Sequence, residues 1–266
     1  MKYSWVLHAK AQEDQTDELI KNWMDIALSY DETLGLSPAI IGIEGKGYSG
    51  KIMDFKKGYK KVTDTAFKGV EGIGLYTIES DDRDFAFYWK VLMDIVFSEV
   101  KGITAFIGVD LDVAGKDQVL NEAVLPVSKL LNVTYGYSFV MPAEKGPYSY
   151  GNSFIHVEEG HELTDEEEML IIQGSPYIRL INDGKGILRD VFQENLLADV
   201  QLNAQVEGKS LKEWILSDPA HGSLSDFAGK PYWKVDKNNL VNVREVLHRN
   251  GLILAYDKDI IPGIPD

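Results

Sequence analysis

The chain begins with MKYSWVLHAKAQEDQ at residues 1–15, and this stretch predicts its first strand. Tyr3, Trp5 and Leu7 recur at every second position, which is the period of a strand with one buried face. Ala9-Lys10-Ala11 looks like a signal-peptidase site. The apolar run before it is shorter than the roughly seven residues that a signal core needs. We therefore expect a structural strand here and no secretion signal.

Hydrophobic spacing predicts alternating helices and strands over the rest of the N-terminal part. A helix capped by Asp14 or Thr16 should run to about Tyr30. Strands are expected at 39–43, 72–78, 103–109 and 133–141. The apolar run 85–100 has a mixed period that favours a helix and leaves a strand open. A helix at 117–131 should be kinked or split by Pro126, and 142–152 should be a turn-rich loop.

The C-terminal part is predicted from capping and turn signals. A capping box at Thr164-Asp-Glu-Glu167 should open a helix towards residue 172, and Gly251 should close another at 241–250. A third helix is expected near 211–216, with strands at 177–181, 232–235 and 252–256. The predicted class is α+β, with mixed or antiparallel sheets and packed helices. A larger N-terminal part (1–173) should join a smaller C-terminal module (174–266) near 173–176.

Composition limits the class of protein. At 266 residues, with 44% apolar and 26% charged residues, the chain can form a substantial core. It has no cysteine, which excludes disulfides, thiolate metal sites and cysteine nucleophiles. No apolar run approaches the twenty residues of a membrane span. We expect a soluble, cytoplasmic protein with no cofactor and no membrane partner.

Charge is distributed unevenly along the chain, whose formal net charge is −15. One block without Lys or Arg contains seven acids: Glu158, Glu159, Glu162, Asp165, Glu166, Glu167 and Glu168. Another window contains seven lysines: Lys46, Lys51, Lys56, Lys57, Lys60, Lys61 and Lys68. With Asp54 and Asp64 that window carries +5, so the remainder carries −20. An acidic surface repels phosphate backbones and attracts basic proteins, which favours a protein partner over a nucleic acid.

The lysine window begins with a near-match to a phosphate-binding loop. Gly45-Lys-Gly-Tyr-Ser-Gly50-Lys51 has the glycine and lysine spacing, but Ile52 stands where the magnesium-binding Ser or Thr belongs. The residues that follow have no clean amphipathic face. We interpret the segment as a basic loop and predict no nucleotide site.

Two further groups of residues are candidates for function. His156, Glu159 and His161 resemble a zinc motif, but the spacing is one residue too long and Gly160 argues against a helix. We predict no metal there, and an enzyme that uses these histidines stays open as the alternative. Tyr148 and Tyr150 lie in the Gly/Pro-containing loop and are candidate partner contacts, with local packing as the other interpretation.

Segments in the C-terminal third resemble the immunity 52 family. They are Ile187-Leu-Arg-Asp-Val-Phe192, Asn195-Leu-Leu197, Leu211-Lys-Glu-Trp-Ile215, His221-Gly-Ser-Leu224, Trp233, Val243-Arg-Glu-Val-Leu247 and Gly251-Leu-Ile253, with Gly146-Pro-Tyr-Ser-Tyr150 further upstream. The resemblance covers about a hundred residues in pieces. It implies an immunity protein of a polymorphic toxin or type VI secretion system. Members of that family are encoded beside restriction-endonuclease-like toxins and protect the producing cell by binding them.

The resemblance and the charge together predict a non-enzymatic inhibitor of a cognate toxin, and the toxin we expect is a nuclease with a basic surface. The seven acids at 158–168 are the first candidates for the contact surface, with Tyr148 and Tyr150 as anchors. The alternative interpretation of the acids is a solvated helix start that aids solubility. A nucleic-acid binder acting through the lysine window is the remaining rival, and the −20 elsewhere argues against it.

Overall fold

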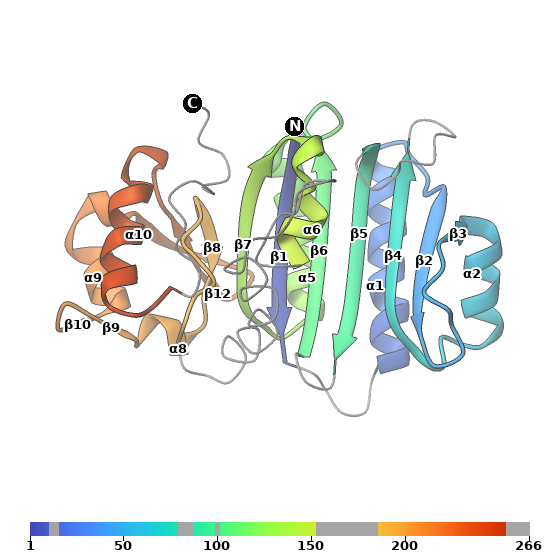
Figure 1. Cartoon of the computed structure of the whole chain (residues 1–266), viewed down its shortest axis with the longest axis horizontal. Helices are drawn as coiled ribbons and strands as arrows, with labels where there is room; N and C mark the ends of the chain where they lie inside the picture. The colour runs from blue at the N-terminus through green and yellow to red at the C-terminus, as the bar shows by residue number, and fades with distance from the viewer. Residues whose placement is uncertain (11–15, 79–87, 99–101, 153–185, 254–266) are drawn as a thin grey trace, which may run out of the picture.

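The computed structural model of the chain describes residues 1–10, 16–78, 88–98, 102–152 and 186–253. Ten strands form one antiparallel sheet in the order β11-β12-β8-β7-β1-β6-β5-β4-β2-β3 (Figure 1). Their bounds are β1 Lys2–Ala9, β2 Ile40–Gly45, β3 Met53–Asp54, β4 Val70–Ile78, β5 Trp89–Ser98, β6 Gly102–Asp110, β7 Val133–Met141, β8 Glu194–Leu196, β11 Ser223–Phe227 and β12 Lys230–Lys234. A separate small hairpin pairs β9 (Gln205–Val206) with β10 (Lys209–Ser210). The prediction of an α+β class is confirmed.

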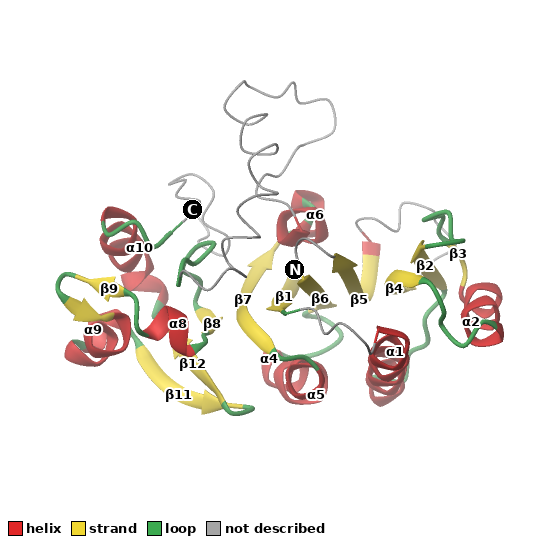
Figure 2. Cartoon of the chain, turned by 90° about the horizontal axis from the view of Figure 1, so that it is seen from below, coloured by secondary structure: helices red, strands yellow, loops and turns green. Residues whose placement is uncertain are grey.

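Helices lie on both faces of this sheet. Figure 2 shows α1 and α5 against one face and α6 against the other. The helical bounds are α1 Thr16–Thr33, α2 Phe55–Asp64, α4 Lys116–Val119, η1 Leu120–Val124, α5 Leu125–Leu130, η2 Ala143–Lys145, α6 Pro147–Asn152, α8 Asp199–Leu202, α9 Leu211–Ser217, η3 Pro219–His221, η4 Lys237–Asn239 and α10 Leu240–Arg249. No helix in the described ranges is long and apolar enough to span a membrane.

The first strand is central and buried on both faces. β1 pairs antiparallel with β6 and β7, and all eight of its residues are buried. Tyr3, Trp5 and Leu7 enter the core under α1 and α5, whereas Val6 enters the core on the opposite face. The prediction of a half-buried strand is therefore wrong. The second face is covered by α6 and the C-terminal module, whose positions no local period reveals.

The two faces of the sheet carry different cores. The face under α1 and α5 is mainly aliphatic, with Trp5 and Trp23 as its largest side chains. The opposite face is aromatic: Trp89 meets Phe106 edge-on, with ring centroids 6.2 Å apart, and Tyr137 stacks on Phe192 at 4.4 Å. Because aromatic rings bury large areas and prefer such tilted and offset contacts, this layer has a well-defined packing.

The run 85–100 is a strand where it is described, which contradicts the favoured helix. β5 lies between β4 and β6. Its Val91 and Ile95 point into one core, while Trp89 and Leu92 point into the other. A strand buried on both faces gives a continuous apolar run with no period of two.

Pro126 splits the predicted helix at 117–131, as expected. Proline has no N–H, so it donates no backbone hydrogen bond to the preceding turn. The chain widens into the π-helical turn η1, and the N–H of Leu125 donates to the carbonyl of Leu120. A new helix, α5, starts there with the proline in its first turn.

The helix predictions for the C-terminal part are confirmed where the chain is described, and β12 overlaps the strand expected at 232–235. The strand expected at 252–256 is described only at 252–253, where Ile253 forms an isolated parallel bridge with Leu188. α9 and α10 match the helices expected at 211–216 and 241–250, and Gly251 has the left-handed φ of +68° that a helix stop requires. The loop predicted at 142–152 instead contains the short helices η2 and α6. The boundary predicted near 173–176 and the elements expected at 164–172 and 177–181 lie outside the described residues. That division stays a prediction, although β8, β11 and β12 from beyond it join the main sheet.

Gly108→Ala tests the aromatic layer. A Cβ at this position in β6 would lie 2.5 Å from Cη2 of Trp89 and 2.7 Å from Cε1 of Phe106, and both rings are fully buried. We expect the free energy of unfolding to fall by about 1–3 kcal/mol in urea denaturation. The control is Gly42→Ala in β2, where the nearest atoms would be at an ordinary 3.8 Å. Equal stability of the two variants would contradict this account.

Candidate functional site

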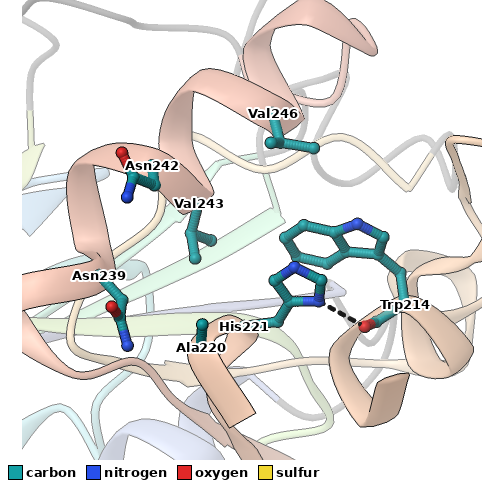
Figure 3. Close-up of a pocket in the computed structure, with 7 residues that line it drawn as sticks. All are labelled: Trp214, Ala220, His221, Asn239, Asn242, Val243 and Val246. Atoms are coloured by element: carbon teal, nitrogen blue, oxygen red, sulfur yellow. Dashed lines mark hydrogen bonds between the residues drawn. The ribbon is translucent and has the colours of Figure 1, made fainter. Parts of the chain in front are cut away.

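A small pocket lies between two helical segments of the C-terminal module. Its volume is about 200 Å³. Trp214 of α9 and His221 of η3 form one wall, and Val243 and Val246 of α10 form the other (Figure 3). Asn239 and Asn242 lie at the end away from the indole, and Ala220 completes the lining.

His221 is held in one orientation and one tautomer. Its ring stacks on Trp214 with a centroid separation of 3.7 Å and an interplanar angle of 9°. Nδ1 lies 2.7 Å from the carbonyl oxygen of Trp214. Because a carbonyl oxygen only accepts, Nδ1 must carry the hydrogen. In the neutral ring Nε2 is then an acceptor, and it faces α10 across the pocket (Figure 3).

Capping hydrogen bonds position the wall formed by α9 and η3. Ser210 and Glu213 form a reciprocal capping box that starts α9, with Ser210 Oγ accepting from the N–H of Glu213 at 3.2 Å. Asp218 then ends the helix, and its carboxylate accepts from the N–H of Ala220 at 2.8 Å to start η3. The carbonyl oxygen of His221 accepts from Trp233 Nε1 at 2.9 Å. The backbone of η3 is thus tied to both neighbouring elements.

A buried ion pair lies on the core side of α10. Arg244 Nε and Nη2 donate to the two carboxylate oxygens of Asp190 at 2.7 and 2.5 Å, and Arg244 is only 1% exposed. The neighbouring Arg189 donates to the hydroxyl of Tyr137 and, at 2.7 Å, to the carbonyl of Tyr150. This polar network joins α10 to β7 and α6. A bidentate Arg–carboxylate contact fixes geometry as well as charge.

Four of the segments on which the immunity 52 resemblance rests, 187–192, 211–215, 221–224 and 243–247, contribute residues to the pocket or to the ion pair behind it. Trp214, His221 and Val243 line the pocket, and Asp190 and Arg244 form the pair behind it. These residues are dispersed over more than fifty positions of the sequence. Four dispersed segments are therefore packed together around the pocket, while residues 147–150 lie in α6 and 195–197 at β8.

The two tyrosines predicted as partner contacts make their contacts within this chain. Tyr148 is half-buried, and its hydroxyl donates to Asp94 Oδ2 at 3.1 Å. Tyr150 is 4% exposed and packs edge-on against Phe139, with a centroid distance of 4.9 Å. Their α6 lies across the middle of the sheet. Their role as partner contacts stays a prediction, and the packing interpretation accounts for what the two rings touch.

The other predicted site residues lie outside the described ranges. This holds for His156, His161 and all seven acids of the block: Glu158, Glu159, Glu162, Asp165, Glu166, Glu167 and Glu168. Within the residues that are described, no three His, Asp or Glu side chains are grouped to hold a metal ion.

The glycine-lysine segment does not open a helix. β2 ends at Gly45, and the chain then forms a turn and the short strand β3, so α2 starts only at Phe55 with Asp54 as its N-cap. A phosphate-binding loop leads directly into a helix. The interpretation as a basic loop fits residues 46–52. The expectation that the following residues lack an amphipathic face is wrong, because α2 buries Gly58 and Val62 and exposes its lysines. All seven lysines of the window are exposed.

A wider polar pocket lies where the module meets the main sheet, and sequence patterns gave no sign of it. Its volume is about 590 Å³, and Lys116, Lys234 and Glu194 contribute to its lining. Glu194 accepts hydrogen bonds from three hydroxyl groups, those of Tyr3 (2.5 Å), Ser138 (2.6 Å) and Tyr232 (2.7 Å). Burial alone would raise the pKa of Glu194, but these three donors hold it below its ordinary value. No local signal could find this site, because its donors come from three strands distant in sequence.

Comparison with solved structures finds a likeness that extends over nearly the whole chain. "Pseudomonas aeruginosa T6SS protein PA0821" has a TM-score of 0.56 and 10% identity over 99% of this chain and 78% of that one. The toxic C-terminal tip of CdiA from Pseudomonas aeruginosa in complex with an immune protein has a TM-score of 0.28 and 16% identity, over 55% of this chain and 92% of that one. The second score is too low to carry an argument. No protein-family model and no curated protein matches the chain. At 10% identity the first likeness shows a shared fold alone.

Arg244→Met tests the ion pair behind the pocket. The change leaves the buried carboxylate of Asp190 without its charge partner, which should cost about 3–5 kcal/mol of unfolding free energy. The matched control is Arg249→Met, since Arg249 is exposed on the same helix. Chemical denaturation of both variants gives the comparison. A loss below about 1 kcal/mol for Arg244→Met would contradict the role of the pair.

Asp94→Asn tests the carboxyl group under Tyr148. Burial raises the pKa of Asp94 to about 7, nearby Glu44 adds to the rise, and the hydrogen bond from Tyr148 opposes it. Between about pH 4 and 7 the folded protein holds a proton that the unfolded chain has released. Unfolding free energy should therefore fall in wild type, relative to Asp94→Asn, by roughly 2–4 kcal/mol as pH rises through this window. Exposed Asp25→Asn is the control, and a difference independent of pH would refute the assignment.

Proposed function

We propose that this chain is an immunity protein, which binds a cognate antibacterial toxin and neutralises it in the cytoplasm of the producing cell. It acts by binding and not by catalysis. The observation that supports this most is that four of the resemblance segments pack together around one pocket, within a chain that shares its fold with a T6SS protein over 99% of its length.

We further propose that the toxin is a nuclease with a basic surface. The immunity 52 resemblance implies a restriction-endonuclease-like toxin, and the net charge of −15 complements a groove built to hold phosphates. Complementary charge speeds association, while buried anchor residues slow dissociation. The same acidity argues against nucleic acid or an anionic membrane as partner.

The direct test is neutralisation of the product of the neighbouring gene. That protein should arrest growth when it is expressed alone in a susceptible bacterium, and co-expression of this chain should restore growth. The purified pair should form a complex in size-exclusion chromatography. A gene neighbour that is not toxic, or a toxin that this chain neither binds nor blocks, would refute the proposal.

Seven substitutions test the acidic block as the contact surface. Changing the glutamates and aspartate of 158–168 to Gln and Asn should lower the association rate with the toxin and flatten its dependence on salt. The matched control changes the seven lysines of 46–68 to Gln, which alters as many charges with the opposite sign. Stopped-flow measurements at several salt concentrations give both quantities. Unchanged affinity and unchanged salt dependence would remove the block from the interface.

A further inference from the structure

We infer that the pocket between α9, η3 and α10 receives one arginine side chain of a protein partner. The inference deepens the proposed function, because it names the kind of toxin residue that would anchor the complex. It rests on the proposed function, which identifies the partner as a toxin. The pocket holds about 200 Å³, the volume of about seven waters, which suits a single long side chain.

The walls of the pocket favour a side chain with an apolar stem. Val243 and Val246 of α10 face the Trp214–His221 stack across the cavity (Figure 3). Arginine and lysine bury such stems against apolar surface while the head group finds polar partners. An aliphatic stem in this position would contact two valines on one side and the aromatic stack on the other.

The polar groups of the pocket select a hydrogen-bond donor. The Nδ1 hydrogen of His221 is already bound to the carbonyl of Trp214, so the neutral ring offers its Nε2 only as an acceptor. The Asn239 and Asn242 amides at the other end each carry an acceptor oxygen beside an NH2 donor group, so their oxygens can accept from a guanidinium. A carboxylate ligand would meet no cationic side chain among these lining residues, and the chain's net charge of −15 would repel it. The site therefore suits a cationic donor.

Several hydrogen-bond acceptors around one pocket favour arginine over lysine. The guanidinium is planar, presents five N–H donors and is less strongly hydrated than an ammonium group. Arginine is also enriched among the residues that dominate binding energy at protein interfaces. The His221 acceptor is preorganised, since its ring is stacked on Trp214 and η3 is held by Asp218 and Trp233. Little ordering entropy is then lost on binding.

The first arm of the test needs no toxin. The full chain, labelled with ¹⁵N, is titrated with butylguanidinium, butylammonium and butyrate while the indole N–H signal of Trp214 is followed. We expect a saturable shift with butylguanidinium, a weaker one with butylammonium, and none with butyrate. The shift should disappear in Ala220→Phe, which fills the pocket from an exposed position. It should persist in Ser225→Phe, which places the same ring on the exposed strand β11.

The second arm uses the toxin that this chain binds. Ala220→Phe should weaken affinity by about 30-fold or more, the effect of losing an interface anchor, whereas Ser225→Phe should leave affinity unchanged. Asn242→Leu removes an acceptor from an exposed position without filling the pocket and should weaken binding in the same direction. Melting temperatures verify that each variant is folded.

The two arms separate the failure of this inference from the failure of the proposed function. If butylguanidinium shifts the Trp214 signal no more than butyrate does, the pocket does not select arginine and the inference is overturned. Toxin affinity that is equal in wild type and Ala220→Phe overturns it as well. If wild type binds no toxin at all, the proposed function fails, and the fragment titration still decides the chemistry of the pocket.

Discussion

A strand of three residues, β8, holds the C-terminal module to the main sheet. It pairs with β7 on one side and with β12 on the other, so the sheet continues from the N-terminal strands into the module. Glu194 opens this strand and accepts hydrogen bonds from Tyr3, Ser138 and Tyr232, which belong to β1, β7 and β12. One partly buried carboxylate thus joins four strands. A charge in such a place is stable only because its donors satisfy it, and this requirement fixes the register of all four strands together.

The sequence predicted the elements whose signals are local. α9, α10 and β7 lie close to their predicted bounds, α10 with Gly251 as its predicted stop, and Pro126 interrupts its helix as predicted. The prediction of secondary structure and burial failed for strands that are buried on both faces, because such strands need no alternation of apolar and polar residues. β5 has a continuous apolar run. β1 has the alternation of a half-buried strand, but the layer that covers its second face comes from Tyr150 of α6 and from residues between 188 and 253. Local patterns carry no information on which distant segment will cover a face.

The candidate site shows the same limit more strongly. Sequence reasoning singled out charged blocks and loop tyrosines, because charge and composition can be read from adjacent residues. The pocket is made from Trp214, His221 and Val243, which are individually unremarkable and gain meaning from the stack, the tautomer and the facing helix. The resemblance segments did include these residues, but a resemblance identifies a fold and does not state which of its side chains touch a partner.

The geometry of the pocket depends on the rotation of α10 about its own axis. Successive residues of an α-helix are about 100° apart around its axis. When Arg244 points towards Asp190, the directions of Val243 and Val246 are therefore fixed at about 100° and 200° from that of Arg244. The two-point contact between the guanidinium and the carboxylate resists rotation more than apolar packing would, since apolar contacts have no preferred direction. The shape of the α10 wall is therefore set from the core side of the helix. A buried ion pair contributes little net stability compared with apolar replacements, and its value here is that it holds one helix face towards the pocket.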